Sequence, residues 1–318
     1  MSVAWGLLST APINLKLLNA AHSSDRAEVV AVASREAARA EAYAREQGIA
    51  RSHGSYDALL ADPEVEAVYI SLPNGLHVEW TLRALEAGKH VLCEKPFSRR
   101  AADVERAFDR ADAAGLVLSE GFMWRHHRQT AKLVSLIAEG AIGPLRLIRV
   151  AFSFPLAVER SPDDARFSAE LDGGAMMDVG CYCVSAIRLF AGEPQSLTAK
   201  QVVGPTGVDV VFAGTLTHAA DVISHFDCGF VLPRRSELEL LGEDGSLFVS
   251  KPFVITAPGI ELRRGGGVEH VVVDHVDAYV LELENVSGAI RGEEALLLGR
   301  EDALGQARTI EALYGAAA

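Results

Sequence analysis

Short apolar runs alternate with amphipathic stretches over the first 120 residues. The apolar runs cover residues 3–8, 28–34, 65–71, 90–94 and 116–121. The amphipathic stretches cover residues 14–22, 35–47, 76–87 and 100–114, and a glycine follows each of the last three. Most runs show no alternation of apolar and polar residues, which is typical of parallel strands covered by helices on both faces. The pattern predicts repeated βαβ units and a doubly wound parallel sheet, a Rossmann domain, over residues 1–122.

The pattern changes after about residue 122. A helical stretch at 128–139, an alternating run at 145–154 and a helix at 175–191 precede a strand-rich region at 196–273, and two helices follow at 276–291 and 299–314. This order predicts an α+β domain over residues 123–318 with a mostly antiparallel open sheet, and an α/β protein as a whole. An open sheet face needs a cover, so we expect a homodimer or homotetramer formed through the C-terminal sheet.

Composition narrows the class of protein. A chain of 318 residues is long enough for two cores, and its net charge of -13 argues against nucleic acid as a partner. No apolar run approaches the roughly 20 residues that span a membrane, so we expect no membrane partner and a cytoplasmic location. Four cysteines without metal-ligand spacing predict buried, reduced thiols. His126 and His127 are adjacent and therefore point apart, so we expect no catalytic metal.

The first strand runs into a turn that could hold a dinucleotide. The glycines of the usual fingerprint would fall on Ser9, Ala11 and Asn14, so the chain departs from it at all three positions. Small side chains at 9 and 11 still allow the backbone to approach a pyrophosphate, and the free N–H groups at the helix start can bind phosphate. An ordinary strand–helix turn is the alternative.

The end of the second strand carries cations where NAD-preferring sites carry an acid. Ser34 and Arg35 follow the strand directly, and Arg39 comes one helical turn later. A hydroxyl and two guanidinium groups favour the 2′-phosphate of NADP over the free ribose hydroxyl of NAD. We therefore predict NADP as the cofactor, with NAD possible. A solvated first helical turn is the alternative interpretation.

Two compact motifs follow the third and fourth strands. The segment Pro73-Asn74-Gly75-Leu76-His77 follows one strand, and Glu94-Lys95-Pro96 follows the next. Ligands of open parallel sheets bind outside the carboxyl ends of the strands, so both motifs lie at the expected edge. A lysine between a buried strand and a proline is a strong candidate for a chemical role.

Together with GGAMMDVGCY, these motifs resemble the GFO/IDH/MocA oxidoreductases over essentially the whole chain. The segments WGLLSTA and EGFMWRHHRQ and the spacing Asp178-x-x-x-Tyr182 are most similar to the D-xylose dehydrogenase and dimeric dihydrodiol dehydrogenase subgroup. The expected catalytic residues are Lys95, Tyr182 and Asp178. The expected substrate-binding residues are Lys95, Arg125, Arg166, Asp178 and Tyr182. The expected cofactor-binding residues are Ser9, Thr10, Ala11, Ile13, Ser34, Arg35, Arg39, Leu72, Pro73, Asn74, His77, Glu94, Lys95 and Pro96.

The resemblance implies a proton transfer coupled to a hydride transfer. Tyr182 is the expected acid/base, and because a free tyrosine has a pKa of roughly 10, a cation such as Lys95 would favour its phenolate. Asp178 is four residues earlier on a predicted helix, hence on the same face. Asp178 as a capping acid and Tyr182 as a core tyrosine are the structural alternatives. Arg125 and Arg166 could equally form structural ion pairs, and His77 could be a capping or core histidine.

The reaction expected is NADP-dependent oxidation of an aldose pyranose, such as D-xylose or D-glucose, at C1 to the lactone. Reduction of a keto- or anhydro-sugar with NADPH and oxidation of a trans-dihydrodiol are the chemical alternatives. A non-catalytic regulatory protein that binds NADP is the alternative of another class. Lys95, Asp178 and Tyr182 argue against it, because a binding module does not need them.

Overall fold

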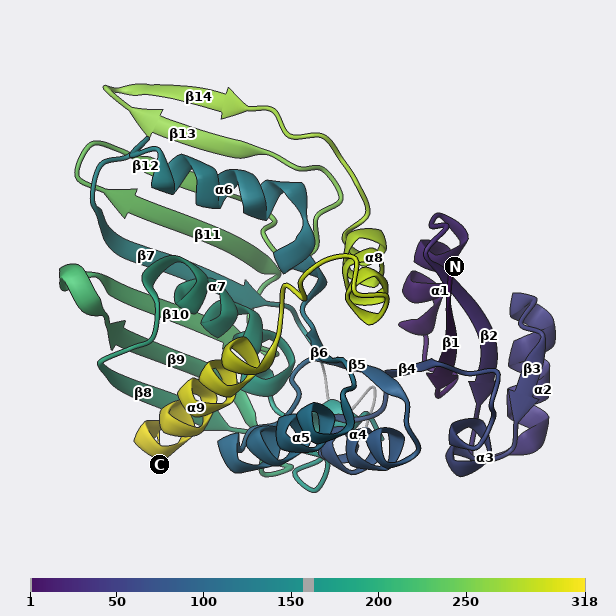
Figure 1. Cartoon of the computed structure of the whole chain (residues 1–318). Helices are drawn as coiled ribbons and strands as arrows, with labels where there is room; N and C mark the ends of the chain where they lie inside the picture. Colours follow the sequence, from purple (N-terminus) through teal and green to yellow (C-terminus); the bar gives the residue numbers. More distant parts are fainter. Residues whose placement is uncertain (1, 157–162, 318) are drawn as a thin grey trace. The chain divides into compact units, whose positions relative to one another are not determined.

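The computed structural model describes residues 2–156 and 163–317. The chain forms two compact units, one made of Met1–Met123 with Asp277–Leu304 and the other of Trp124–Val276 with Gly305–Ala318. Residues 277–304, predicted within the second domain, belong to the first unit. Each unit is built on one sheet (Figure 1).

The first unit contains a six-stranded parallel sheet. Its strands are β1 (Val3–Leu8), β2 (Ala27–Ala33), β3 (Arg51–His53), β4 (Ala67–Ile70), β5 (His90–Glu94) and β6 (Leu118–Gly121). They pair in the order β3-β2-β1-β4-β5-β6, all in parallel register. This is the strand order of a dinucleotide-binding fold, in which the order reverses between β1 and β4 and a crevice opens there at the carboxyl ends. The predicted parallel sheet is confirmed.

Helices that connect these strands, and one helix from later in the chain, cover the sheet. They are α1 (Asn14–His22), α2 (Ala37–Gln47), α3 (Tyr56–Leu60), α4 (His77–Glu86), α5 (Ala101–Ala114) and α8 (Ala278–Ile290), with the short 3-10 helix η1 (Asn74–Leu76). Gly48 and Gly115 end α2 and α5 with φ of 70° and 65°. Glycine adopts this left-handed conformation without a Cβ penalty, which is why the predicted helix ends are correct.

The second unit contains an eight-stranded sheet. Its strands are β7 (Leu145–Ser153), β8 (Ser196–Val203), β9 (Asp209–Thr217), β10 (Ile223–Gly229), β11 (Arg235–Gly242), β12 (Ser246–Val249), β13 (Ile260–Arg264) and β14 (Gly267–Val271). They pair in the order β14-β13-β12-β11-β7-β10-β9-β8, and every pair is antiparallel except β7 with β10. The mostly antiparallel sheet is therefore confirmed.

Helices of the second unit lie against one face of its sheet (Figure 1). They are α6 (Arg128–Ala138), α7 (Cys181–Ala191) and α9 (Arg300–Ala317), with the short helical turns η2 (Met123–His126), η4 (Ala165–Phe167), η5 (Met176–Gly180) and η6 (Ala219–Asp221). Helix α7 contacts β7 and β10. Burial alternates along these strands: Val150 and Phe226 are buried, while Arg149 and His225 are exposed. The exposed side chains belong to the opposite face of the sheet.

Three short elements were not predicted from the sequence: β3, α3 and β13. Strand β3 has three polar residues, and β13 has the sequence IELRR. Such short segments show too few periods to reveal a pattern. Helix α3 is one turn long and is capped by Ser55, whose hydroxyl accepts the Ala58 N–H at 3.1 Å.

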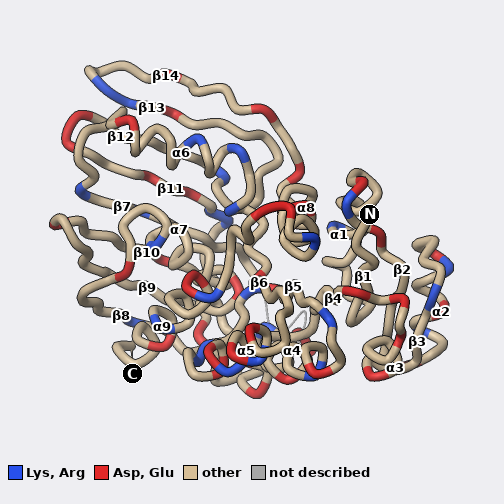
Figure 2. Tube along the Cα trace, in the orientation of Figure 1, with Lys and Arg blue, Asp and Glu red and all other residues tan. Residues whose placement is uncertain are grey.

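Charged residues of both signs are interspersed along the two units (Figure 2). Within the described ranges 2–156 and 163–317, no helix is both long enough and apolar enough to cross a membrane. The same ranges contain no group of three or more His, Cys, Asp or Glu side chains able to hold a metal ion. All four cysteines are buried free thiols.

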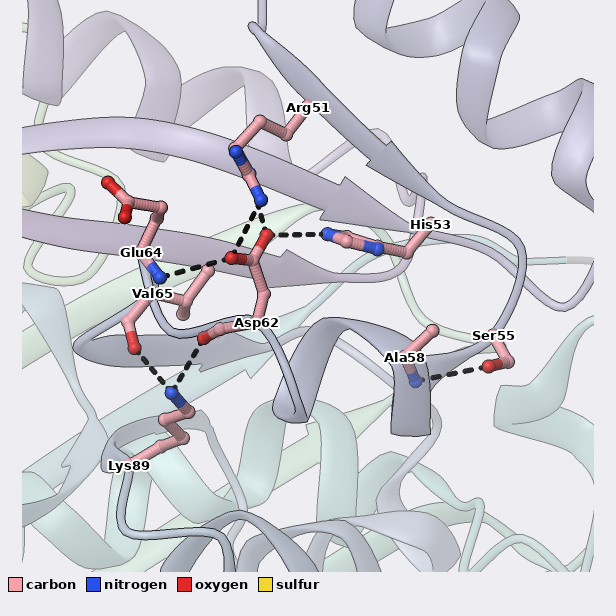
Figure 3. Close-up of polar contacts among 8 residues, drawn as sticks. All are labelled: Arg51, His53, Ser55, Ala58, Asp62, Glu64, Val65 and Lys89. Carbon is pink, nitrogen blue, oxygen red and sulfur yellow. Dashed lines mark hydrogen bonds and ion pairs between the residues drawn. The ribbon is translucent and has the colours of Figure 1, made fainter.

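A buried carboxylate organises the chain between β3 and β4 (Figure 3). The Asp62 carboxylate accepts hydrogen bonds from Arg51 at 2.7 and 2.9 Å, from the Glu64 N–H at 3.0 Å, and contacts His53 Nε2 at 2.8 Å. Burial disfavours the ionised carboxyl, but the hydrogen bonds it accepts outweigh that cost and lower the pKa of Asp62 to about 2. The carboxylate is therefore ionised and fully used by the fold.

Lys89 completes this cluster from the loop before β5. Its ammonium donates to the backbone carbonyls of Asp62 at 2.8 Å and Val65 at 2.6 Å. Burial lowers the pKa of Lys89, while the nearby Asp62 carboxylate raises it. The lysine thus fastens the segment that enters β4 to the segment that enters β5.

Candidate active site

Side-chain hydrogen bonds hold the turn after β1. Ser9 has a φ of 153°, and its hydroxyl lies 2.7 Å from the Ser71 hydroxyl and accepts the Ala11 N–H at 3.0 Å. The Asn14 amide donates to the Ser9 carbonyl at 2.7 Å, and its oxygen accepts from the Ser71 hydroxyl at 2.6 Å. Ser9, Ser71 and Asn14 thus form a closed, buried network that fixes the turn where other dinucleotide sites use glycines. We call it the Ser9 network.

Asn14 and Ser71 were not among the residues expected to serve the site. The one sequence signal for Asn14 was its place at the third fingerprint position, which looked like a departure and is an alternative way to fix the turn. The expected cofactor residues Thr10, Ala11 and Ile13 are partly exposed in this turn. They lie at the carboxyl edge of the sheet, where a pyrophosphate can approach.

The cations expected to select NADP stand at the end of β2. Ser34 is buried, and Arg35 and Arg39 are exposed at the start of α2. Burial raises the pKa of Tyr56, and the positive charges of Arg35 and Arg39 oppose this shift. Neither guanidinium forms an ion pair with any other residue that the structure describes. Both are available to an anionic group such as a 2′-phosphate.

His77 joins the two loops that follow β4 and β5. Its side chain is 1% exposed, with Nδ1 2.9 Å from the Pro96 carbonyl and Nε2 2.7 Å from the Leu72 carbonyl. Carbonyl oxygens only accept, so both contacts are hydrogen bonds when both ring nitrogens carry protons. The contacts make His77 a positioning residue for the loops that hold Pro73, Asn74 and Lys95.

Two acids, Glu94 and Glu120, accept hydrogen bonds from backbone N–H groups of the loop after β5. Glu94 accepts a short hydrogen bond from the Tyr69 hydroxyl and contacts the Lys95 N–H at 3.3 Å. Burial, reinforced by Glu94, raises the pKa of Tyr69, so the phenol stays protonated and donates. Glu120 on β6, which the sequence analysis did not single out, accepts the Phe97 N–H at 2.8 Å. The Lys95–Pro96 bond between them is cis.

In the second unit, Asp209 holds the start of the segment that carries Asp178. Its carboxylate accepts the Met176 N–H at 2.7 Å and the Tyr314 hydroxyl at 2.8 Å. A Cβ at Gly174, where φ is 119°, would collide with the Asp209 carboxylate. Gly174 therefore permits the close approach, and Asp209 fixes the helix start. The sequence offered no signal for Asp209, which lies 31 residues after Asp178.

The sequence predicted Asp178 and Tyr182 on one regular α-helix, and the structure differs. Asp178 lies in a π-helical turn, Met176–Gly180, and α7 begins directly after it. A Cβ at Gly180 would lie 2.6 Å from Met176 Sδ and 2.8 Å from Cys228 Sγ, so the glycine allows the turn to pack against β10. A π-turn widens the helix locally and is frequent at functional sites. Helical periodicity in the sequence does not reveal it.

Arg166 and Asp178, both expected to bind substrate, lie together. Arg166 makes a bidentate pair with Asp164 at 2.9 and 2.6 Å, and its Nη1 lies 3.8 Å from Asp178 Oδ2. The guanidinium is thus held between two acids. Arg125, the other expected substrate-binding arginine, lies 5.9 Å from the centroid of the Trp124 ring.

Tyr182 is held by an aromatic cluster at the start of α7. Its ring centroid lies 5.5 Å from that of Phe152 and 5.3 Å from that of Phe253, and the two phenylalanines stack at 5.3 Å. The tyrosine side chain is 7% exposed. Edge-to-face and tilted packing of this kind fixes the direction of the phenol.

Comparison with known proteins covers both units. The profile of the oxidoreductase family with an NAD-binding Rossmann fold (GFO/IDH/MocA) matches residues 11–122, and that of the GFO/IDH/MocA C-terminal domain matches residues 130–248. The chain is 36% identical to D-xylose 1-dehydrogenase (NADP(+)) 2 of Haloferax volcanii, over 98% of this chain and 97% of that enzyme. It is also 36% identical to dTDP-3,4-didehydro-2,6-dideoxy-α-D-glucose 3-reductase of Streptomyces violaceoruber, over 90% of this chain and 84% of that enzyme.

A solved structure matches the fold along nearly the whole length. It is a 3-ketoreductase from Actinomadura kijaniata in complex with NADP and TDP-benzene, with a TM-score of 0.93 and 31% sequence identity. The match covers 99% of this chain and 98% of that one.

Proposed function

Because the chain belongs to the GFO/IDH/MocA oxidoreductase family, we propose that it transfers a hydride between a sugar CH–OH group and NADP. The observation that carries the proposal is the pair of exposed guanidinium groups of Arg35 and Arg39 at the end of β2, which form no ion pair within residues 2–156 and 163–317. They fit a dinucleotide that bears a 2′-phosphate. Relatives that use NADP by name support the same cofactor.

The expected cofactor residues fit NADP by their chemistry. Thr10, Ala11 and Ile13 lie in the turn that would face the pyrophosphate, with the Ala11 N–H donated to the Ser9 hydroxyl. Ser34 with the two arginines would hold the adenosine end. Leu72, Pro73 and Asn74 would border the nicotinamide, in loops that His77 ties together. When bound, NADP supplies the hydride acceptor.

The protein's own residues would move the proton. Tyr182 would take the proton of the reacting hydroxyl as the C–H hydride leaves the same carbon, and Lys95 would donate a hydrogen bond to that oxygen. Asp178 and Arg166 would orient neighbouring hydroxyls of the sugar. Because the sugar and NADP would be held in a fixed geometry, the reaction would not need a further encounter between them. This positioning would supply a large part of the acceleration.

For the substrate we propose an aldose pyranose, oxidised at C1 to the lactone. The 36% identity to a D-xylose 1-dehydrogenase over 98% of the chain supports this reaction. The test is formation of NADPH with D-xylose and D-glucose, followed by identification of the lactone. Turnover with NAD at a lower KM than with NADP would contradict the cofactor assignment.

Reduction of a keto-sugar is the second candidate. The similarity of the whole fold to a 3-ketoreductase, at a TM-score of 0.93, favours it. Oxidation of NADPH by a keto-sugar, with no NADPH formed from any aldose, would replace the first candidate with this one. Oxidation of a trans-dihydrodiol belongs in the same substrate panel.

A regulatory protein that binds NADP without catalysis is the rival from another class. Lys95→Ala separates the two hypotheses. In an enzyme this variant keeps its affinity for NADP and loses turnover, whereas a sensor has no turnover to lose.

We also propose a homodimer or homotetramer through the C-terminal sheet. The strand face that carries the exposed Arg149 and His225 supports it, since the helices of the second unit lie against the other face and leave this one open to a partner. A monomer mass by light scattering at micromolar concentration would contradict it.

A further inference from the structure

Within the second unit, helix α9 carries two polar side chains on its packed face. Gln306, Ile310 and Leu313 are buried, and Tyr314 is partly buried. Their spacing of i, i+4, i+7 and i+8 places them on one side of the helix. A buried amide or phenol costs free energy unless it is hydrogen-bonded. The bonds of these two groups therefore show what this face of α9 holds in place.

Gln306 holds the start of α7. Its Nε2 donates to the Cys181 carbonyl at 2.7 Å. Cys181 is the first residue of α7 and directly follows the π-helical turn at Met176–Gly180. The oxygen of the same amide lies 3.4 Å from Arg188 Nη1, and this arginine is already paired with Glu193 at 2.6 Å. The shorter bond, to the end of the π-turn, is therefore the main contact of the buried amide.

Tyr314 holds the other end of the same turn through one intermediate residue. Its hydroxyl donates to Asp209 Oδ1 at 2.8 Å, and Asp209 Oδ2 accepts the Met176 N–H at 2.7 Å. Met176 is the first residue of the π-turn, and Asp209 is buried. The Tyr314 ring packs edge-on against Phe212, with centroids 5.4 Å apart. This packing orients the phenol independently of its hydroxyl.

We propose that Gln306 and Tyr314 are positioning residues, which hold both ends of the π-turn and thereby fix the direction of the Asp178 carboxylate. A π-turn is a rare conformation that needs support from its surroundings. The two bonds end two residues before Asp178 and three residues after it. A displacement of about 1 Å at a positioning group can lower a rate on the order of 100-fold. The inference rests on the proposed function for the role of Asp178 toward the sugar.

The kinetic test uses two conservative substitutions in α9. Tyr314→Phe removes the hydroxyl and keeps the ring against Phe212, and Gln306→Met removes the amide at similar volume. For each variant we expect kcat/KM for D-xylose with NADP, or for a keto-sugar with NADPH, to fall at least tenfold. The Kd for NADPH, measured by fluorescence, should stay that of the parent, because the expected cofactor residues all belong to the first unit. A kcat/KM equal to the parent's in either variant overturns the proposal.

Two controls separate positioning from general damage to the fold. Arg308→Gln, at an exposed position of α9, should leave kcat/KM unchanged. In an Asp178→Asn background the turn no longer places a carboxylate, so Tyr314→Phe should cost less than a further threefold. Substitutions that act through one group are not additive, whereas independent damage is. A further loss of threefold or more overturns the role assigned to Tyr314.

Hydrogen exchange distinguishes a failure of this inference from a failure of the proposed function. The amides of residues 176–182 should exchange at least tenfold faster in Tyr314→Phe than in the parent or in Arg308→Gln, because the turn opens more often. Unchanged exchange overturns the proposal. Faster exchange in a protein that oxidises no sugar and reduces no keto-sugar would refute the oxidoreductase function and leave the hold of α9 on the turn supported.

Discussion

Strand β5 has a lysine at each end, and the two lysines have different surroundings. Lys89, before the strand, is 8% exposed and its ammonium is bonded to the Asp62 and Val65 carbonyls. Lys95, after the strand, is partly exposed between Glu94 and Pro96. A lysine committed to backbone carbonyls has little left for a ligand. A lysine at the carboxyl edge of a parallel sheet lies where ligands bind.

The same contrast extends to the polar clusters around the two ends. The Asp62 cluster, at the entry to β4 and β5, is charged, and its acid is bonded by Arg51 and a backbone N–H. The Ser9 network, at the exit from β1 and β4, is built of hydroxyl and amide groups only. A neutral network fixes the turn without placing a fixed charge beside a phosphate. The charged Asp62 cluster, which stabilises the fold, and the neutral Ser9 network, which fixes the proposed cofactor turn, thus lie at opposite ends of the strands.

The largest effect on turnover should come from Lys95, the lysine after β5. Lys95→Met should lower kcat roughly 100- to 1,000-fold, the usual size of the loss of one hydrogen-bond donor to the reacting oxygen. Its melting temperature should stay close to that of the parent, because the side chain is partly exposed. Steady-state kinetics and thermal unfolding measure the two quantities. If the variant keeps its turnover, Lys95 has no role in the reaction and the contrast between Lys89 and Lys95 does not hold.

Asp62→Ala should have the largest effect on stability. We expect the free energy of unfolding to fall by about 3 kcal/mol, since a buried carboxylate and its hydrogen bonds are lost. The estimate is at the lower end for broken buried pairs because the Arg51 side chain is 44% exposed and can be solvated. Denaturant unfolding measures the loss. At 25 °C the kcat of the folded fraction should not change.

Acid titration offers a second readout for Asp62. Its folded pKa of about 2 lies below the unfolded value of roughly 3.9. The ionised carboxylate therefore contributes its full stabilisation above about pH 4, and the contribution is lost as the pH falls to about 2. Asp62→Asn should show a flatter loss of stability than the parent between pH 5 and pH 2. Parallel curves for the two proteins would show that the pKa of this carboxyl is not depressed.

Lys89→Met, the counterpart of Lys95→Met, should cost about 2 kcal/mol of unfolding free energy. Two buried carbonyls lose their donor, and each such loss costs about 1–3 kcal/mol before any relaxation. Methionine keeps most of the side-chain volume, so the comparison isolates the ammonium. Measured side by side, the two lysine variants should exchange phenotypes: one loses turnover, the other stability. A loss of turnover in Lys89→Met at full folding would break the comparison.

The parallel sheet could be predicted because its signals are long or sharp. Five strands lie in short, mostly apolar runs, and α2 and α5 end at glycines in the left-handed conformation. Strand β3 escaped prediction because RSH has no apolar residue. The π-turn at Met176–Gly180 escaped because its packing against Cys228 depends on a strand more than 40 residues away.

The position of the candidate site could be predicted from the sequence, but most of the residues that hold its loops in place could not. The loops at Pro73 and Lys95 follow strands, so their edge of the sheet could be inferred from order alone. His77 was expected at the cofactor, yet its burial and two carbonyl contacts could not be inferred from a motif. Asp209 has no sequence signal at all, because its partner Met176 is distant in the chain. Supporting residues are defined by tertiary contacts, and a single sequence does not contain those.

The smallest effect should come from the Ser9 network. Asn14→Ala removes the donor to the Ser9 carbonyl and the acceptor for Ser71. The turn then samples other conformations, and we expect about a tenfold rise in the Kd for NADP, equal to roughly 1.4 kcal/mol. Fluorescence titration with NADPH measures it. Asn19→Ala, an exposed position in the same helix, controls for helix propensity.

A second substitution tests whether the network replaces glycine. Ser9 has a φ of 153°, which glycine adopts at no steric cost. Adding Ser9→Gly to Asn14→Ala should therefore recover part of the lost affinity, because the turn no longer needs side chains to hold it. If the network only fills space, the double variant will bind NADP more weakly than either single one. Recovery would mean that the phosphate-binding turn of this fold can be formed either by glycine, which adopts the required φ without strain, or by buried hydrogen bonds. This chain uses the hydrogen bonds.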